Sequence, residues 1–236
     1  HVDLAEAAKR GIIISNVPTY GEHTVAEFAM ALLLSLSRRI VDAYSRIETT
    51  GSFSQEGLRG FDLKGRTIGI IGTGHIGEHM IRMARGFDMN VVAFDVYQKP
   101  DLAATLGFRY VELNELLGMS DIISLHAPYN EHTHHMINMG NIDKIKRGCY
   151  FINTSRGGLV ETVALVKGLE EGLLAGAGLD VLEEEGQMVD ENMLLAAQHP
   201  NEESLRTVLA NHYLINHPHV IVTAHIAFNT QEAIER

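Results

Sequence analysis

Short runs of β-branched and other apolar residues alternate along the chain with amphipathic stretches of about 10 to 15 residues. The runs that predict strands are residues 67–71, 91–94, 122–125, 150–153, 178–181 and 220–223, with a weaker one at 108–111. Strands separated by amphipathic helices are typical of βαβ units around a parallel sheet. The pattern therefore predicts an α/β fold with a doubly wound parallel (Rossmann) sheet.

The stretch between the first two strands has a helical period. Ile76, Met80, Met83, Ala84 and Phe87 recur at intervals of three and four residues. This spacing gives a helix one apolar face that can pack on a sheet. We expect this helix to begin directly after the glycine-rich turn that ends the first strand.

A second helix is predicted near the start of the chain, over residues 24–39. Thr24 and Glu27 have the spacing of a capping box. Residues 29–34 are apolar on every side of the helix, so they need cover from their own domain and from something else. A second subunit would make this helix the interface of a homodimer, and a further part of the same chain is the alternative.

The alternation of strands and helices is interrupted at residues 186–218, which are acidic and helical in pattern. Leu205, Val208, Leu209 and Tyr213 would share one helical face. We interpret the segment as an excursion from the sheet that covers a site.

Length, charge and cysteine content exclude several classes of protein. The 236 residues suffice for one large domain, or for one domain with pieces of another. The formal charge of −11 argues against nucleic acid or an anionic membrane as a partner. Cys149 is the single cysteine, which excludes an internal disulfide, and its apolar surroundings predict a buried, inert thiol. With no apolar block of membrane length and no signal-peptide pattern, we expect a soluble cytoplasmic protein.

The first strand leads into a G-x-G-x-x-G turn formed by Gly72, Gly74 and Gly77. In a dinucleotide site, these glycines permit the sharp turn, the approach of the diphosphate and close packing of the helix. The same spacing also fits a glycine corner without a ligand. Asp95, at the end of the next strand and 18 residues after Gly77, has the position of the acid that binds the adenosine ribose hydroxyls. This combination favours NAD over NADP.

Three later strand ends carry groups suited to chemistry. Arg156 can clamp a carboxylate and a carbonyl oxygen in bidentate fashion, although it could equally pair with a local carboxylate. Asp180 and His225 end two further strands. Because ligands bind at the carboxyl ends of strands in such sheets, the three groups should converge. Together they supply an anion-binding group, a carboxylate and an acid–base imidazole. These groups suit hydride transfer to a 2-oxo acid, because its carbonyl oxygen must gain a proton.

The motifs DLKGRTIGIIGTGHIG, VVAFD, DIISLHAP, INTSRGGLV, GLDVLEEE and TAHIAF follow one another along the chain. In these motifs the sequence resembles the D-isomer-specific 2-hydroxyacid dehydrogenases, especially the D-lactate dehydrogenase branch. The resemblance implies hydride transfer between NADH and a small 2-oxo acid, with pyruvate and D-lactate as first candidates. A non-catalytic NAD(H)-binding sensor or interaction module and a truncated cofactor domain with little turnover are the alternatives.

The resemblance also implies roles for single residues. Arg156 would bind the substrate, His225 would donate the proton, and Glu185 would hydrogen-bond the histidine. The cofactor would be bound by Gly72, Gly74, His75, Ile76 and Gly77 at the diphosphate, Asp95 at the ribose, Ala127, Pro128 and Thr133 on the adenine side, Thr154 and Ser155 on the nicotinamide side, and Asp180 at the carboxamide. His75 is shorter than the family's usual basic or polar residue there, and Glu183 and Glu184 are expected to be solvated.

Two groups of histidines need a separate interpretation. His132, His134 and His135 form one, and His212, His217 and His219 the other. Neither has the accompanying carboxylates or thiolates of an ordered metal site, so we expect solvated histidines and no metal.

The resemblance implies a division into domains. Residues 1–18 would be the remnant of a flavodoxin-like substrate domain, residues 19–226 the NAD-binding domain with the excursion at 186–218, and residues 227–236 the start of the return to the substrate domain. We expect most of the substrate domain to be absent from the printed sequence.

Overall fold

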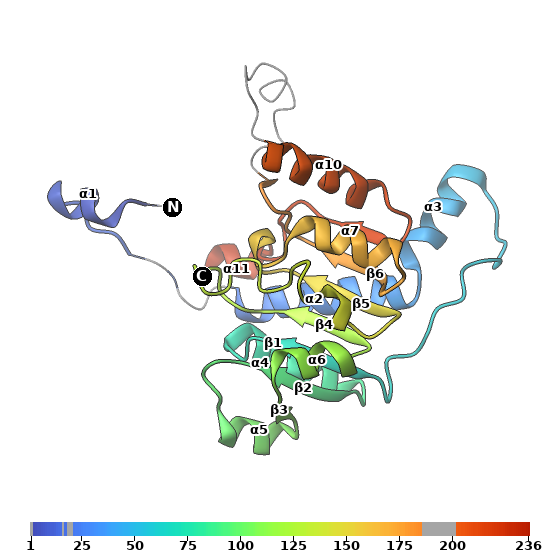
Figure 1. The fold of residues 1–236 in the computed structure, drawn as a ribbon, viewed down its shortest axis with the longest axis horizontal. Coiled ribbons are helices and arrows are strands. Elements are labelled where there is room, and N and C mark those ends of the chain that lie inside the picture. Colours follow the sequence, from blue (N-terminus) through green and yellow to red (C-terminus); the bar gives the residue numbers. More distant parts are fainter. Residues whose placement is uncertain (1, 16, 18–20, 186–201) are drawn as a thin grey trace.

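The computed structural model describes residues 2–15, 17, 21–185 and 202–236. Its centre is a parallel sheet with the strand order β3-β2-β1-β4-β5-β6-β7 (Figure 1). The strands are β1 (Thr67–Ile71), β2 (Asn90–Phe94), β3 (Arg109–Tyr110), β4 (Ile122–Leu125), β5 (Cys149–Asn153), β6 (Leu174–Leu179) and β7 (Val220–Val222). The order reverses between β1 and β4, which confirms the predicted doubly wound sheet.

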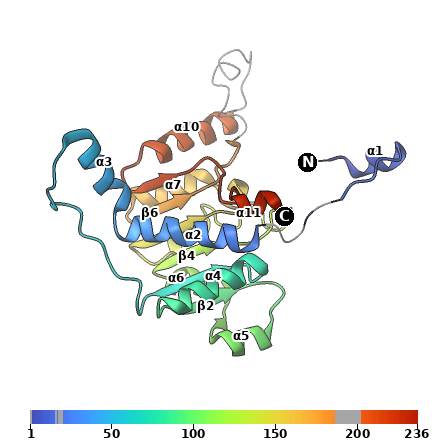
Figure 2. The same cartoon turned by 180° about the vertical axis from the view of Figure 1, so that it is seen from behind.

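Helices cover both faces of the sheet, as the two views in Figures 1 and 2 show. The helices are α1 (Leu4–Lys9), α2 (Glu22–Ser37), α3 (Ile40–Thr50), α4 (His75–Gly86), α5 (Pro100–Leu106), α6 (Leu113–Met119), α7 (Thr162–Glu170), α10 (Glu202–Asn216) and α11 (Gln231–Glu235). One apolar cluster joins α2 and α4 to the sheet, and a second joins α6, α7 and α10 to its other face. Neighbouring strand residues such as Ile70 and Ile71 enter different clusters, so the strands are buried on both sides.

The strand predictions hold for six strands, but β6 begins earlier than expected. It spans Leu174–Leu179, whereas the prediction was 178–181. Gly176 and Gly178 hid the start of this strand from the prediction, because glycine is uncommon in strands. A Cβ at Gly176 would lie 2.7 Å from the His219 carbonyl oxygen, and one at Gly178 would lie 3.0 Å from Leu32 Cβ. Close packing therefore demands glycine inside this strand.

The capping box predicted at Thr24 is wrong. Helix α2 begins at Glu22 with Gly21 as its N-cap, and no side chain caps it. Thr24 lies inside the helix and is buried, so its hydroxyl cannot serve the helix terminus. Ala29 and Leu33 are fully buried where α2 packs on α4, β5 and β6, whereas Ala31 is exposed. The domain itself thus supplies most of the cover for the apolar stretch.

Two predicted helical faces need correction. On α4, Met80 and Ala84 are fully buried, but Phe87 is the C-cap residue and is 41% exposed. On α10, Leu209 is 68% exposed, and the buried face runs through Asn211 and Leu214. The amide of Asn211 donates to the Glu183 carbonyl oxygen at 2.8 Å, so a polar residue occupies the centre of the packed face.

The predicted excursion is described only in part, because residues 186–201 lie outside the described residues. Its described part, α10, packs on α7 and β7 and so belongs to the layer that covers the sheet. In both views α1 lies away from the sheet, and within residues 2–15 only Ala7 is buried. No helix of the described residues has the length and apolar character needed to span a membrane.

Candidate cofactor and proton-transfer site

The residues singled out in the sequence follow the carboxyl ends of the strands along one edge of the sheet. In the order of the strands across the sheet, these positions are Asp95 after β2, Gly72 after β1, His126 after β4, Thr154 after β5, Asp180 after β6 and His225 shortly after β7. Strand pairing therefore brings together groups that are far apart in sequence. The order places Asp95 towards one end of the edge and His225 at the other.

The three glycines of the turn have different surroundings. Gly72 has a φ of +96°, and a Cβ there would lie 2.6 Å from the His126 carbonyl oxygen. A Cβ at Gly77 would lie 2.0 Å from the Gly72 carbonyl oxygen. Gly74, the N-cap of α4, has open space where its Cβ would be. The turn thus leaves room above the first amides of α4, which is the form of a diphosphate cradle.

Asp95 is held against this turn. Its Oδ2 accepts hydrogen bonds from the Thr73 amide at 2.6 Å and the Thr73 hydroxyl at 3.0 Å, and its Oδ1 accepts from the Tyr97 amide at 2.8 Å. The Tyr110 hydroxyl lies 2.9 Å from the Thr73 hydroxyl. Sequence reasoning missed Thr73 and Tyr110, because their contacts join two βα units. About one of the carboxylate's four acceptor positions remains for a ribose hydroxyl.

The loop after β4 is closed by its own residues. The Thr133 hydroxyl donates to the Pro128 carbonyl oxygen at 2.7 Å and accepts from the Asn130 amide at 2.8 Å. Thr133 therefore shapes the loop that the sequence places beside the adenine. Ala127 begins this loop next to Gly72, because a Cβ at Gly72 would lie 2.8 Å from the Ala127 nitrogen.

Two buried polar atoms lack partners where β4 and β5 end. His126 Nε2 lies 2.9 Å from the Ser124 hydroxyl, while its Nδ1 and the Thr154 hydroxyl have no hydrogen bond among the described residues. Burial lowers the pKa of His126 to about 4, so the imidazole is neutral at pH 7. Buried polar groups are nearly always paired. These two atoms, together with the open glycine cradle, fit a site that receives a hydrogen-bonding cofactor.

Arg156 extends from the end of β5 and is exposed. Its Nη1 donates to the Ser155 carbonyl oxygen at 2.6 Å, and the Asn153 amide supports the same turn by donating to the Arg156 carbonyl oxygen at 3.0 Å. Within the described ranges, no carboxylate lies at ion-pair distance from this guanidinium. The local pairing considered as an alternative is therefore not observed there.

His225 and Glu185 form a hydrogen-bonded pair. His225 Nδ1 lies 2.6 Å from Glu185 Oε1, and Glu185 Oε2 accepts from the Leu182 amide at 3.2 Å. A carboxylate can only accept, so Nδ1 carries the hydrogen and Nε2 is the nitrogen left for proton exchange.

Asp180 holds the backbone that carries His225. It is fully buried, and its carboxylate accepts from the Thr223 hydroxyl at 2.6 Å and from the amides of Ile226 at 3.0 Å and Ala227 at 2.7 Å. His225 itself has a φ of +54°, a left-handed conformation that is unfavourable for a residue with a side chain. The hydrogen bonds to the Asp180 carboxylate hold the backbone around His225 in this conformation, a role that the sequence did not reveal.

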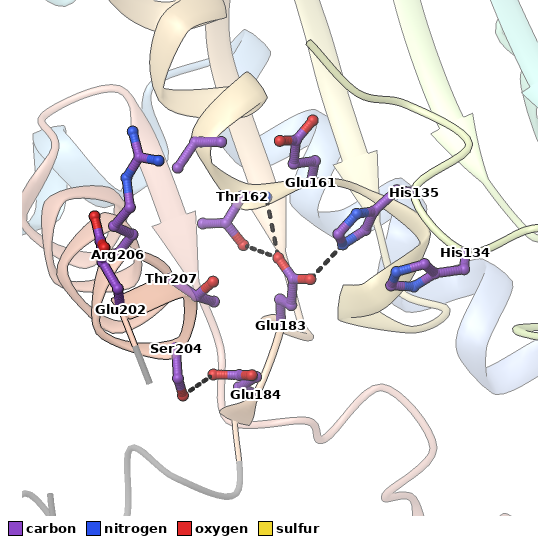
Figure 3. A pocket seen from close by; sticks show the side chains of 11 residues that line it. His134, His135, Glu161, Thr162, Glu183, Glu184, Glu202, Ser204, Arg206 and Thr207 are labelled. Carbon is purple, nitrogen blue, oxygen red and sulfur yellow. Dashed lines mark hydrogen bonds and ion pairs between the residues drawn. The ribbon is translucent and has the colours of Figure 1, made fainter. Parts of the chain in front are cut away.

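The prediction that Glu183 is solvated is wrong. Its carboxylate accepts from the Thr162 amide at 3.1 Å and the Thr162 hydroxyl at 2.8 Å, and it pairs with His135 Nε2 (Figure 3). Thr162 begins α7, so Glu183 caps the positive end of that helix. His135 is likewise half-buried, whereas it was expected to be solvated.

These groups line a hollow of about 680 Å³. Figure 3 shows its lining side chains, which come from α7, α10 and the loop that carries His134. Glu184 accepts a hydrogen bond from the Ser204 hydroxyl at 2.7 Å on its rim. No cluster in the described part of the chain brings together three side chains suited to a metal ion. Cys149 is buried, and burial raises the pKa of its thiol, which confirms an inert cysteine.

Comparison with known proteins identifies the family. A family profile described as "D-isomer specific 2-hydroxyacid dehydrogenase, NAD binding domain" matches residues 30–227. The chain belongs to this family. A 2-hydroxyacid dehydrogenase homolog of Zymomonas mobilis is 43% identical to this chain, over 99% of the chain and 68% of the relative. A glyoxylate reductase of Korarchaeum cryptofilum is 42% identical over 82% of the chain and 59% of the relative.

Solved structures agree with this family assignment. The D-lactate dehydrogenase of Aquifex aeolicus, complexed with NAD and lactic acid, superposes with a TM-score of 0.85 at 36% identity, covering 99% of this chain and 68% of that one. The cofactor of this family's domain is NAD, as the sequence predicted. The chain spans about two thirds of the length of these relatives.

Proposed function

We propose that this 2-hydroxyacid dehydrogenase chain carries the NAD site and the proton-transfer pair of an enzyme that reduces a small 2-oxo acid to a D-2-hydroxy acid. Pyruvate, which gives D-lactate, is the first candidate, and glyoxylate is the second because a glyoxylate reductase is among the similar proteins. The observation that supports the proposal is the His225–Glu185 pair at 2.6 Å, on the same edge of the sheet as the glycine turn and Arg156.

Bound NAD supplies the hydride donor or acceptor. Within the chain, the turn of Gly72, Gly74, His75, Ile76 and Gly77 would hold its diphosphate and Asp95 its adenosine ribose. Ala127, Pro128 and Thr133 would line its adenine side, Thr154 and Ser155 its nicotinamide side, and Asp180 would bind the carboxamide. The Arg156 guanidinium binds the carboxylate of the 2-oxo acid and orients its carbonyl. His225 Nε2 donates the proton that the carbonyl oxygen needs and takes it back in the reverse direction. Glu185 keeps the imidazole in the tautomer that makes this possible.

We further propose the domain division stated above, with residues 19–226 as the cofactor domain and both termini belonging to a substrate domain. The homodimer would form through α2 together with α3. Helix α3 has no buried residue, and its apolar side chains Ile40, Val41, Tyr44 and Ile47 are between 45% and 66% exposed. Their spacing places them on one side of α3, and an exposed apolar stripe next to α2 supports this surface as the contact.

The decisive test is NADH oxidation with a panel of 2-oxo acids, measured for this chain and for a longer version with a complete substrate domain. Turnover in the longer version, highest with pyruvate or glyoxylate and giving the D-isomer, is the expected result. Oxidation by the longer version alone would assign the short chain as a cofactor domain with little turnover. No oxidation by either version would contradict the enzyme and favour the NAD(H)-binding interaction module.

A further inference from the structure

The glycine turn carries a cation from a different βα unit. Lys99 is the N-cap residue of α5, which packs beside α4. Its Nζ donates a hydrogen bond to the Thr73 carbonyl oxygen at 3.0 Å. Thr73 stands between Gly72 and Gly74, so the ammonium group lies at the turn itself. The link depends on the fold, because Lys99 follows Thr73 by a whole helix and strand.

An electrostatic effect places the same ammonium group near the start of α4. Glu78 lies in the first turn of this helix. Its pKa is lowered mainly by a hydrogen bond from Arg82, and the charges of Arg82 and Lys99 lower it further. The charge of Lys99 therefore acts on the first turn of α4 as well as on Thr73. The first amides of a helix are also where an anion binds.

His75 is poorly placed to provide that positive charge. Its side chain is 74% exposed, and its Nδ1 lies 3.7 Å from Glu22 Oε1. A nearby carboxylate competes with any phosphate for the imidazole. Lys99, in contrast, uses one of its three N–H groups on Thr73 and keeps the other two.

We propose that Lys99 is a cofactor-binding residue whose ammonium group neutralises the diphosphate of the dinucleotide at this turn. The proposal rests on the glycine turn as the diphosphate site, which is part of the proposed function. A 2′-phosphate on the ribose is the other phosphate that a lysine here could bind. Asp95 disfavours a 2′-phosphate at this site, because its carboxylate is fixed against Thr73 at 2.6 Å and would repel a second anion beside it.

The test is calorimetric titration of the whole chain with adenosine, 5′-ADP and 2′-AMP. The variants are Lys99→Gln, Lys99→Arg and Lys64→Gln. Lys64 pairs with Asp88 at 3.0 Å just before β1, at the opposite edge of the sheet, so it controls for the loss of one positive charge. We expect Lys99→Gln to weaken 5′-ADP about tenfold, as a lost charge-assisted hydrogen bond would, and to change adenosine less than twofold.

Two further results are expected. Lys99→Arg should restore most of the affinity for 5′-ADP, and Lys99→Gln should reduce the slope of log Kd against log salt concentration. Equal weakening of adenosine and 5′-ADP would show that Lys99 only holds the turn, and weakening confined to 2′-AMP would assign it to the ribose phosphate. Either result, or no change, overturns the proposal. A wild-type chain that binds neither adenosine nor 5′-ADP would instead contradict the cofactor site itself.

Discussion

At the scale of single residues, two carboxylates hold the candidate site together by accepting hydrogen bonds from neighbouring groups. Asp180 uses about three of its four acceptor positions on the loop around His225, and Asp95 uses about three of its four on Thr73 and Tyr97. A carboxylate that accepts several N–H or O–H hydrogen bonds fixes the positions of those donors. The sequence identified both aspartates as site residues, but their partners come from other strands and had no signal in the sequence.

The proton-transfer role proposed for His225 gives a prediction at this scale. His225→Asn should lower kcat about 10²- to 10⁴-fold in a version of the chain that turns over, while the Kd for NADH changes less than threefold, because the imidazole acts when the proton moves. Steady-state kinetics and fluorescence titration measure the two quantities. His132→Asn is the matched control, since His132 is 86% exposed beside Glu131. Equal turnover in the His225 and His132 variants would remove His225 from the mechanism.

At the scale of elements, the three glutamates after β6 have separate tasks. Glu183 caps α7, Glu184 bonds Ser204 of α10, and Glu185 bonds His225. Three identical side chains in a row thus join two helices and His225 to one turn. Their different roles follow from the direction of each side chain, and Glu184 even adopts a φ of +53°. Sequence resemblance singled out Glu185 alone.

The cap on α7 can be tested through stability. Glu183→Gln should lower the free energy of unfolding by about 1–2 kcal/mol, because the helix terminus loses a negative charge and Thr162 loses a charged acceptor. Urea unfolding measures this. Glu184→Gln removes the same charge one residue away at an exposed site, and it should change the free energy of unfolding by less than about 0.5 kcal/mol. Similar losses in both variants would argue against the cap.

At the scale of the whole molecule, histidines kept neutral by the fold connect stability to pH. Burial lowers the pKa of His126 to about 4. Burial and, second, the charge of His23 lower the pKa of His79, whose ring is tilted against the His23 ring with 3.7 Å between the ring centroids, where α2 meets α4. The folded state therefore binds fewer protons than the unfolded state below about pH 6.5. The stability linked to these groups is complete above that pH and is lost as the pH falls.

We predict that the free energy of unfolding declines between about pH 6.5 and pH 4, with about 3 kcal/mol of the decline linked to His126. Urea unfolding in a series of buffers measures it. His126→Asn, which cannot take up a proton, should flatten this decline even if it lowers stability at pH 7. The control His132→Asn changes an exposed histidine and should leave the slope as it is. An unchanged slope in His126→Asn would contradict the buried neutral imidazole.

By itself, the sequence determined the class of fold, the glycine turn, Asp95 and the strand-end positions of Arg156 and His225. Period, residue type and spacing are local properties, and they specify strands, helices and glycines that need left-handed or close-packed backbone. Only the tertiary structure decided which face of α10 is buried, that Glu183 caps α7, that Asp180 supports His225, and that Lys99 reaches the turn at Thr73. Each of these depends on which distant element packs alongside, and that information lies in the pairing of strands and helices across the molecule.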